Sequence, residues 1–110
     1  MAEAHVVFTA QAIREDVSRH EDRLFAPWRV GRPDNYAPDS RTKATVCLGF
    51  WMREELQKLG LSEEDRRIQE NAFYRWSRSR EDLFELAAEI MNDAASGNIL
   101  RDRVPHHRWG

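Results

Sequence analysis

The sequence contains only one cysteine, Cys47, so it cannot form an internal disulfide. Because small extracellular domains usually depend on several disulfides, we expect an intracellular, reducing compartment, most simply the cytoplasm, with an organelle matrix as the alternative. No apolar run approaches the ~20 residues that a membrane-spanning helix needs. The chain starts without the basic and hydrophobic segments of a secretory signal, and its early acids disfavour a mitochondrial presequence.

A strong charge of one sign is also absent. The 17 basic and 19 acidic side chains leave a net charge of −2, so no general attraction to nucleic acid or anionic membranes is expected. With 41% hydrophobic and 33% charged residues, the composition is that of a folded soluble protein, and 110 residues predict a single domain. Four tryptophans are many for this length and favour large aromatic anchors in a core or an interface.

In the first part of the chain, apolar residues recur at helical spacing. This stripe predicts a helix from about Glu3 to Phe25, which Pro27 should end. A short strand over residues 6–9 is the alternative, because β-branched and aromatic residues favour strands, but the longer helical period outweighs it. His20 lies on the apolar stripe, which favours a packed or interface histidine over a metal ligand or a general base.

Three of the four prolines lie in residues 26–40, which predicts an ordered, proline-rich loop. This loop also carries Trp28, Val30 and Tyr36, which a solvated linker does not need. We therefore expect the loop to lie across the domain or to contact another chain. Trp28 and Tyr36 are candidate partner-binding residues, since large aromatic side chains are enriched among those that dominate binding.

The next apolar stripe predicts a helix from Arg41 to Leu59, capped by Asp39 or Ser40 and stopped at Gly60. A strand over residues 45–52 is the competing interpretation, because short apolar runs do not reveal their period. Cys47 lies inside this run and is expected to be a buried, unreactive thiol.

Residues 62–97 form the longest amphipathic stretch, which begins at the capping residue Ser62 and closes at Gly97. It predicts one long helix, or two helices that meet near residues 77–80. The expected fold is therefore all-α, with three to four helices. In it, the two N-terminal helices pack on the long C-terminal helix or helix pair.

Arginines alternate with aromatic residues in residues 73–80, a combination that single-stranded nucleic acid favours because it offers cations to phosphates and rings to bases. On this hypothesis Arg75, Arg78 and Arg80 contact phosphates. The alternative is a solvated helix face with the aromatic rings pointing inward, and an i,i+4 pair of Arg78 with Asp82 favours it.

Three glutamates, Glu81, Glu85 and Glu89, follow one another at i,i+4 spacing. They predict either a solvent-exposed helix face or a binding surface for a basic partner. The polar tail, residues 98–110, ends near Trp109, a further candidate partner-binding residue. In the same tail, His106 and His107 lack a third metal ligand at a diagnostic spacing.

The sequence contains no glycine-rich phosphate loop, nucleophile elbow or paired-carboxylate motif. We therefore expect no enzymatic activity, cofactor or metal. The favoured function is a small helical interaction protein that self-associates or binds a protein partner, as an adaptor, an accessory subunit or an inhibitor that blocks a surface. The alternative is a nucleic-acid-associated regulator that uses residues 73–80.

Overall fold

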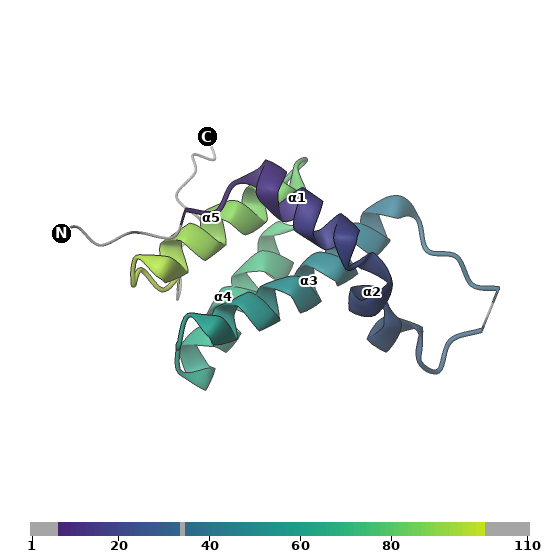
Figure 1. Cartoon of the computed structure of the whole chain (residues 1–110), viewed down its shortest axis with the longest axis horizontal. Coiled ribbons are helices and arrows are strands. Elements are labelled where there is room, and N and C mark those ends of the chain that lie inside the picture. The colour runs from purple at the N-terminus through teal and green to yellow at the C-terminus, as the bar shows by residue number, and fades with distance from the viewer. Residues whose placement is uncertain (1–6, 34, 101–110) are drawn as a thin grey trace.

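The computed structural model describes residues 7–33 and 35–100, and its regular structure is entirely helical (Figure 1). The helices are α1 (Ala10–Arg19), α2 (Glu21–Arg29), α3 (Ser40–Lys58), α4 (Glu63–Trp76) and α5 (Leu83–Ala95). The all-α prediction is confirmed, and no strand occurs in the described residues, either at residues 7–9 or at residues 45–52. None of the described helices has the length and apolarity to cross a membrane.

Helix α3 is the centre of the fold, because it contacts each of the other four helices (Figure 1). Its buried residues lie on more than one side: Cys47, Leu48, Gly49, Trp51, Met52 and Leu56. The expected arrangement is therefore wrong in two respects. The described residues form five helices where three to four were predicted, and the helix on which the others pack is α3 rather than the C-terminal stretch.

The N-terminal helix is shorter than predicted and is broken. Thr9 has extended backbone and its side chain accepts a hydrogen bond from the Ala12 amide, so the helix begins at Ala10. His20, with φ −118° and ψ 22°, then leaves helical geometry and separates α1 from α2. This break lets α1 pack on α5 and α2 pack on α3, which one straight helix could not do.

Pro27 does not end α2, which continues to Arg29. Proline lacks the amide that would donate to the carbonyl four residues earlier, but here it lies in the last turn of the helix, where few such bonds remain. The loop between α2 and α3 is therefore residues 30–39, shorter than the predicted 26–40.

The helix predicted from Arg41 to Leu59 matches α3 to within one residue at each end, and the predicted caps and stops of the second half are confirmed. The side chains of Asp39 and Ser62 accept hydrogen bonds from the amides of Thr42 and Asp65, which caps α3 and α4. Gly60 and Gly97 adopt φ values of 79° and 81°, the left-handed conformation in which helices end. Of the two alternatives for residues 62–97, the structure shows two helices, α4 and α5, joined by residues 77–82.

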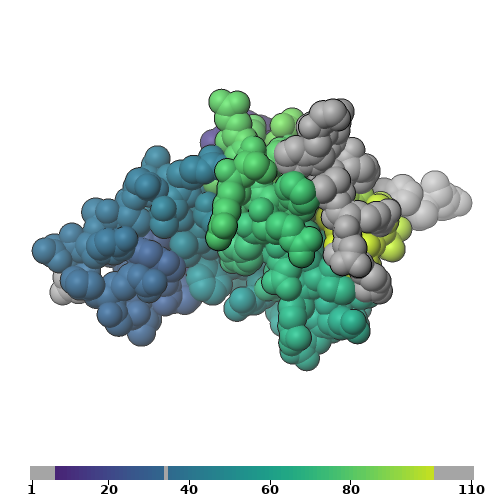
Figure 2. Space-filling view, turned by 180° about the vertical axis from the view of Figure 1, so that it is seen from behind, coloured from purple at the N-terminus to yellow at the C-terminus, as the bar shows by residue number. Residues whose placement is uncertain are grey.

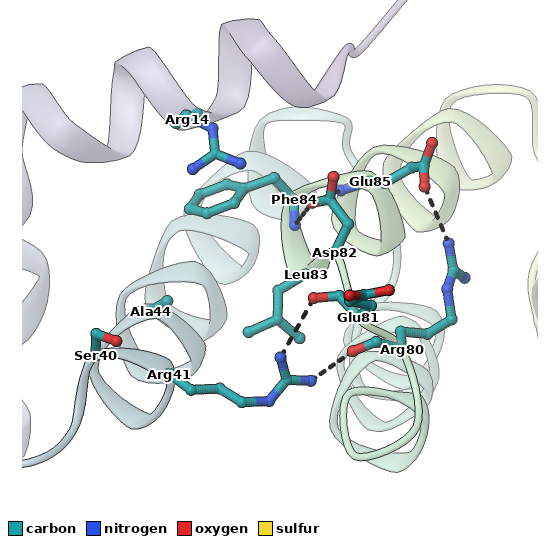
Figure 3. Close-up of a pocket in the computed structure, with 10 residues that line it drawn as sticks. All are labelled: Arg14, Ser40, Arg41, Ala44, Arg80, Glu81, Asp82, Leu83, Phe84 and Glu85. Atoms are coloured by element: carbon teal, nitrogen blue, oxygen red, sulfur yellow. Dashed lines mark hydrogen bonds and ion pairs between the residues drawn. The ribbon is translucent and has the colours of Figure 1, made fainter.

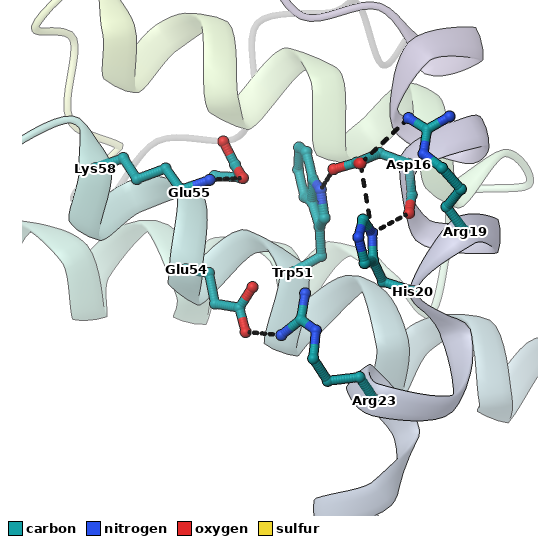
Figure 4. A network of polar contacts seen from close by, with 8 residues as sticks. All are labelled: Asp16, Arg19, His20, Arg23, Trp51, Glu54, Glu55 and Lys58. Carbon is teal, nitrogen blue, oxygen red and sulfur yellow. Dashed lines mark hydrogen bonds and ion pairs between the residues drawn. The ribbon is translucent and has the colours of Figure 1, made fainter.

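A polar network joins α1 to α3 beside the break at His20 (Figure 4). The buried indole of Trp51 donates a hydrogen bond of 2.8 Å to the carboxylate of Asp16, which also lies 3.4 Å from Arg19 and 3.6 Å from the His20 ring. The hydrogen bond from Trp51 is the largest cause that lowers the pKa of Asp16; His20 and Arg19 lower it further, and partial burial opposes the shift. The folded chain therefore stabilises the ionised form of the Asp16 side chain relative to its protonated form.

The folded state should therefore lose stability in acid. A carboxyl group whose pKa is lower in the folded chain stabilises it above the unfolded pKa, about 4, and loses that contribution as the pH falls through the folded pKa. We expect the Asp16→Asn variant to show a shallower decrease of the unfolding free energy below about pH 4, measured by urea denaturation at several pH values. The control is Asp22→Asn, because Asp22 is exposed and makes no ion pair in the described residues. Equal acid sensitivity of Asp16→Asn and the native chain would contradict this assignment.

Candidate protein-binding site

The end of α2 and the loop after it project from one end of the helical body, as Figure 1 shows beside α3 and Figure 2 shows in blue from behind. We call the described residues from Phe25 to Tyr36 the aromatic arm. It carries Trp28 and Tyr36, two of the predicted partner-binding residues, and two of the large exposed hydrophobic side chains, Val30 and Tyr36, which are 76% and 49% exposed.

Three aromatic rings stack along the arm. The ring centres of Phe25 and Trp28 are 5.0 Å apart, and those of Trp28 and Tyr36 are 5.5 Å apart, with interplanar angles of 28° and 29°. Phe25 and Trp28 are three residues apart on α2, so the helix itself places them on one face. Phe25 is buried against the core, Trp28 is half-buried and Tyr36 is exposed, so the stack leads from the core to solvent.

Cationic side chains lie on the same rings. The guanidinium carbon of Arg32 is 3.8 Å from the centre of the Trp28 ring, and that of Arg29 is 5.1 Å from the centre of the Phe25 ring. The ammonium of Lys43, on α3, is 5.3 Å from the same Phe25 ring. Arg32 also donates a hydrogen bond to the carbonyl of Trp28. These contacts fix the loop against α2 and hold the rings in place before any partner arrives.

The three arginines predicted for nucleic acid do not lie in one environment. Arg75 and Arg78 are exposed and form no ion pair with the described residues. Arg80 is buried and makes two hydrogen bonds, of 3.0 and 2.8 Å, to the carboxylate of Glu89. The bond to Glu89 raises the pKa of Arg80 above its usual value. Arg80 therefore acts inside the fold, whereas Arg75 and Arg78 remain at the surface.

The three glutamates at i,i+4 spacing, Glu81, Glu85 and Glu89, also differ in their exposure to solvent. Glu89 is mostly covered, with its side chain 16% exposed, and holds Arg80. Glu85 is exposed and lies 3.8 Å from the same guanidinium, and Glu81 is exposed. The three carboxylates therefore do not form one continuous exposed strip, and only Glu81 and Glu85 are accessible to a basic partner.

A surface hollow of about 720 Å³ lies beside the turn that joins α4 to α5. It is bounded by α1, the start of α3 and the start of α5 (Figure 3). Arg41 lines it and donates hydrogen bonds to three backbone carbonyls, those of Ser77, Arg80 and Glu81. Arg14 lies over the Phe84 ring at 4.3 Å on the opposite wall. The hollow has cations and carboxylates in equal number, so its charges select no ligand.

Among the described residues, the remaining candidates do not form a chemical site. Cys47 is buried, and burial raises the pKa of its thiol, as expected for an unreactive cysteine. His20 is exposed at the α1–α2 break, so it is not packed in the core, and its alternative place at an interface stays a prediction. Within residues 7–33 and 35–100, no group of three or more His, Cys, Asp or Glu side chains is arranged to hold a metal ion. Trp109 and the His106–His107 pair lie outside the described residues.

No family model matches the chain, and no curated protein or solved structure is detectably similar to it.

The different surroundings of the arginines predict different effects on stability. The Arg80→Ala variant should lose about 3–5 kcal/mol of unfolding free energy, because it leaves the covered Glu89 carboxylate without its cation. The Arg75→Ala variant should change it by less than about 0.5 kcal/mol, as exposed substitutions usually do. Urea denaturation of both variants measures the difference. Similar values for the two would show that Arg80 is not structural.

Proposed function

We propose that this protein is a non-enzymatic helical interaction protein, an adaptor or accessory subunit, that binds a protein partner through the aromatic arm. An inhibitor that blocks a partner's surface would use the same contact. The observation that carries the proposal is the ordered stack of Phe25, Trp28 and Tyr36, which ends in an exposed ring.

Two physical features support the proposal. Tryptophan, tyrosine and arginine are the residues most enriched where binding energy is concentrated, and the arm brings all three together. The stack is also formed in the free chain, so a partner does not have to order these side chains, each of which would otherwise cost ~0.5–1.5 kcal/mol. Exposed apolar area on Val30 and Tyr36 then remains for the partner to cover.

The arm can be tested with a variant that should not disturb the fold. We expect the double variant Val30→Ser/Tyr36→Ala to lose its partner while its melting temperature changes little, because both side chains are exposed. The tagged native and variant chains are cross-linked in the native source, and the amount of partner recovered with each chain is compared. Sedimentation analysis measures self-association of the same chains. Removing a residue that dominates binding costs at least ~2 kcal/mol, or roughly thirtyfold in affinity.

A control of similar exposed fraction exists elsewhere on the chain, and its melting temperature is measured as well because the Tyr74 ring also packs against Gly49 of α3. Val7 and Tyr74 are 71% and 44% exposed, close to the 76% and 49% of Val30 and Tyr36, but lie outside the arm. The Val7→Ser/Tyr74→Ala variant should keep the partner. If both double variants recover the partner equally well, or if both lose it, the arm is not the binding surface.

The alternative function, a nucleic-acid-associated regulator, keeps one supporting observation. Arg75 and Arg78 are exposed next to Tyr74, which is also partly exposed. If they contact phosphates, the Arg75→Ala/Arg78→Ala variant should bind single-stranded DNA more weakly, and each arginine removed should lower the salt slope by about one. Gel-shift assays at several salt concentrations measure this, and absence of any shift at low salt would exclude the alternative.

A further inference from the structure

We infer that the aromatic arm recognises an acidic segment of its protein partner, whose carboxylates bind Arg29 and Arg32 while an adjacent apolar residue covers Val30 and Tyr36. This inference rests on the proposed function and specifies the chemistry of the partner.

The arm leaves most of the N–H donors of Arg29 and Arg32 available to a carboxylate. A guanidinium that stacks on an aromatic ring contacts the ring with its own flat face. Its five N–H donors lie in the plane of the group, so they stay available for other partners. Arg32 lies over the Trp28 ring at 3.8 Å and donates to the Trp28 carbonyl, which leaves most of its donors available. Arg29 lies over the Phe25 ring at 5.1 Å and makes no hydrogen bond with a described side chain. A carboxylate can accept two parallel bonds from such an edge.

Neither arginine is neutralised by an acid in the described chain. Arg29 and Arg32 form no ion pair there, whereas the nearby cations Arg23 and Lys43 are held by Glu54 at 2.6 Å and Glu21 at 3.1 Å. In the sequence of the arm, Asp34 is the one acid, and it lies outside the described residues. The arm therefore has a net positive charge on a chain whose overall charge is −2. The positive charge of the arm favours a partner segment that carries negative charge.

The same stack disfavours nucleic acid at this position. Binding of a single strand requires an open ring face on which a base can stack. The Trp28 indole has two faces, and Phe25, Tyr36 and Arg32 already stack on it within 5.5 Å. Protein groups therefore cover the Trp28 faces that a base would need, which leaves the exposed ring of Tyr36 as the remaining place to stack. Arg29 and Arg32, which a carboxylate needs, are exposed.

The inference can be tested with the full chain and defined probes. Fluorescence polarisation would measure binding of a labelled peptide of repeated Glu-Glu-Leu, of the Gln-Gln-Leu peptide of equal length, and of labelled oligothymidylate. We expect binding of the glutamate peptide, weakened by salt, and no comparable binding of the other two probes. The Arg29→Ala/Arg32→Ala variant should lose about tenfold or more in affinity, as expected when charge-assisted hydrogen bonds are removed.

Two further variants separate the contribution of the arm from that of charge alone. Arg75→Ala/Arg78→Ala removes two exposed arginines outside the arm that form no ion pair with the described residues, and it should change the affinity by less than about twofold. Arg29→Lys/Arg32→Lys keeps the charge but loses the planar donors, so it should bind the peptide more weakly than the native chain. No binding of the glutamate peptide at low salt, equal binding of the glutamine peptide, or equal losses in both alanine variants would overturn the inference.

These outcomes are distinct from failure of the proposed function. If Val30→Ser/Tyr36→Ala loses the cellular partner but Arg29→Ala/Arg32→Ala keeps it, the arm is a binding surface and the acidic partner is wrong. If oligothymidylate alone binds the arm, both the acidic partner and the assignment of the arm to a protein are wrong.

Discussion

Two guanidinium groups hold the turn between α4 and α5, and the placement of α5 depends on them. Arg41 reaches from α3 to the carbonyls of Ser77, Arg80 and Glu81, in the turn that follows α4. Arg80 folds back on α5 and binds Glu89 with two hydrogen bonds. Because the pair is largely covered, either charge alone would be strongly unfavourable, so the turn and the first half of α5 are fixed together.

This use of arginine inside the fold contrasts with its use in the aromatic arm. Arg41 and Arg80 satisfy carbonyl and carboxylate oxygens of the chain itself, and their hydrogen bonds are used within the turn. Arg29 and Arg32 instead lie on aromatic rings and form no ion pair with a described carboxylate. Arginine thus has a structural role in the turn, and in the arm we propose that it recognises a partner. This separation is the physical basis for placing partner binding on the arm.

Local features of the fold could be predicted from the sequence, whereas features that depend on distant residues could not. Capping by Asp39 and Ser62 and the stop at Gly60 involve residues within one helical turn, so the sequence pattern contains them. The break at His20 has no glycine or proline to mark it, and it reflects the packing of α1 on α5 and of α2 on α3. Similarly, Arg80 fits a nucleic-acid pattern until its partner, nine residues away on the next helix, is known.

The candidate site was predicted in part, and the part that was missed follows from Pro27. Trp28 and Tyr36 stand out in the sequence because a solvated loop does not need them, but their stacking was not predicted, since Pro27 was expected to end the helix. Because α2 continues to Arg29, Phe25 and Trp28 lie one helical turn apart, and Arg29 follows Phe25 by four residues on the same face. The loop then needs only to bring Arg32 and Tyr36 back to Trp28, which the hydrogen bond from Arg32 to the Trp28 carbonyl secures. A helix that tolerates proline in its last turn is therefore what assembles the arm.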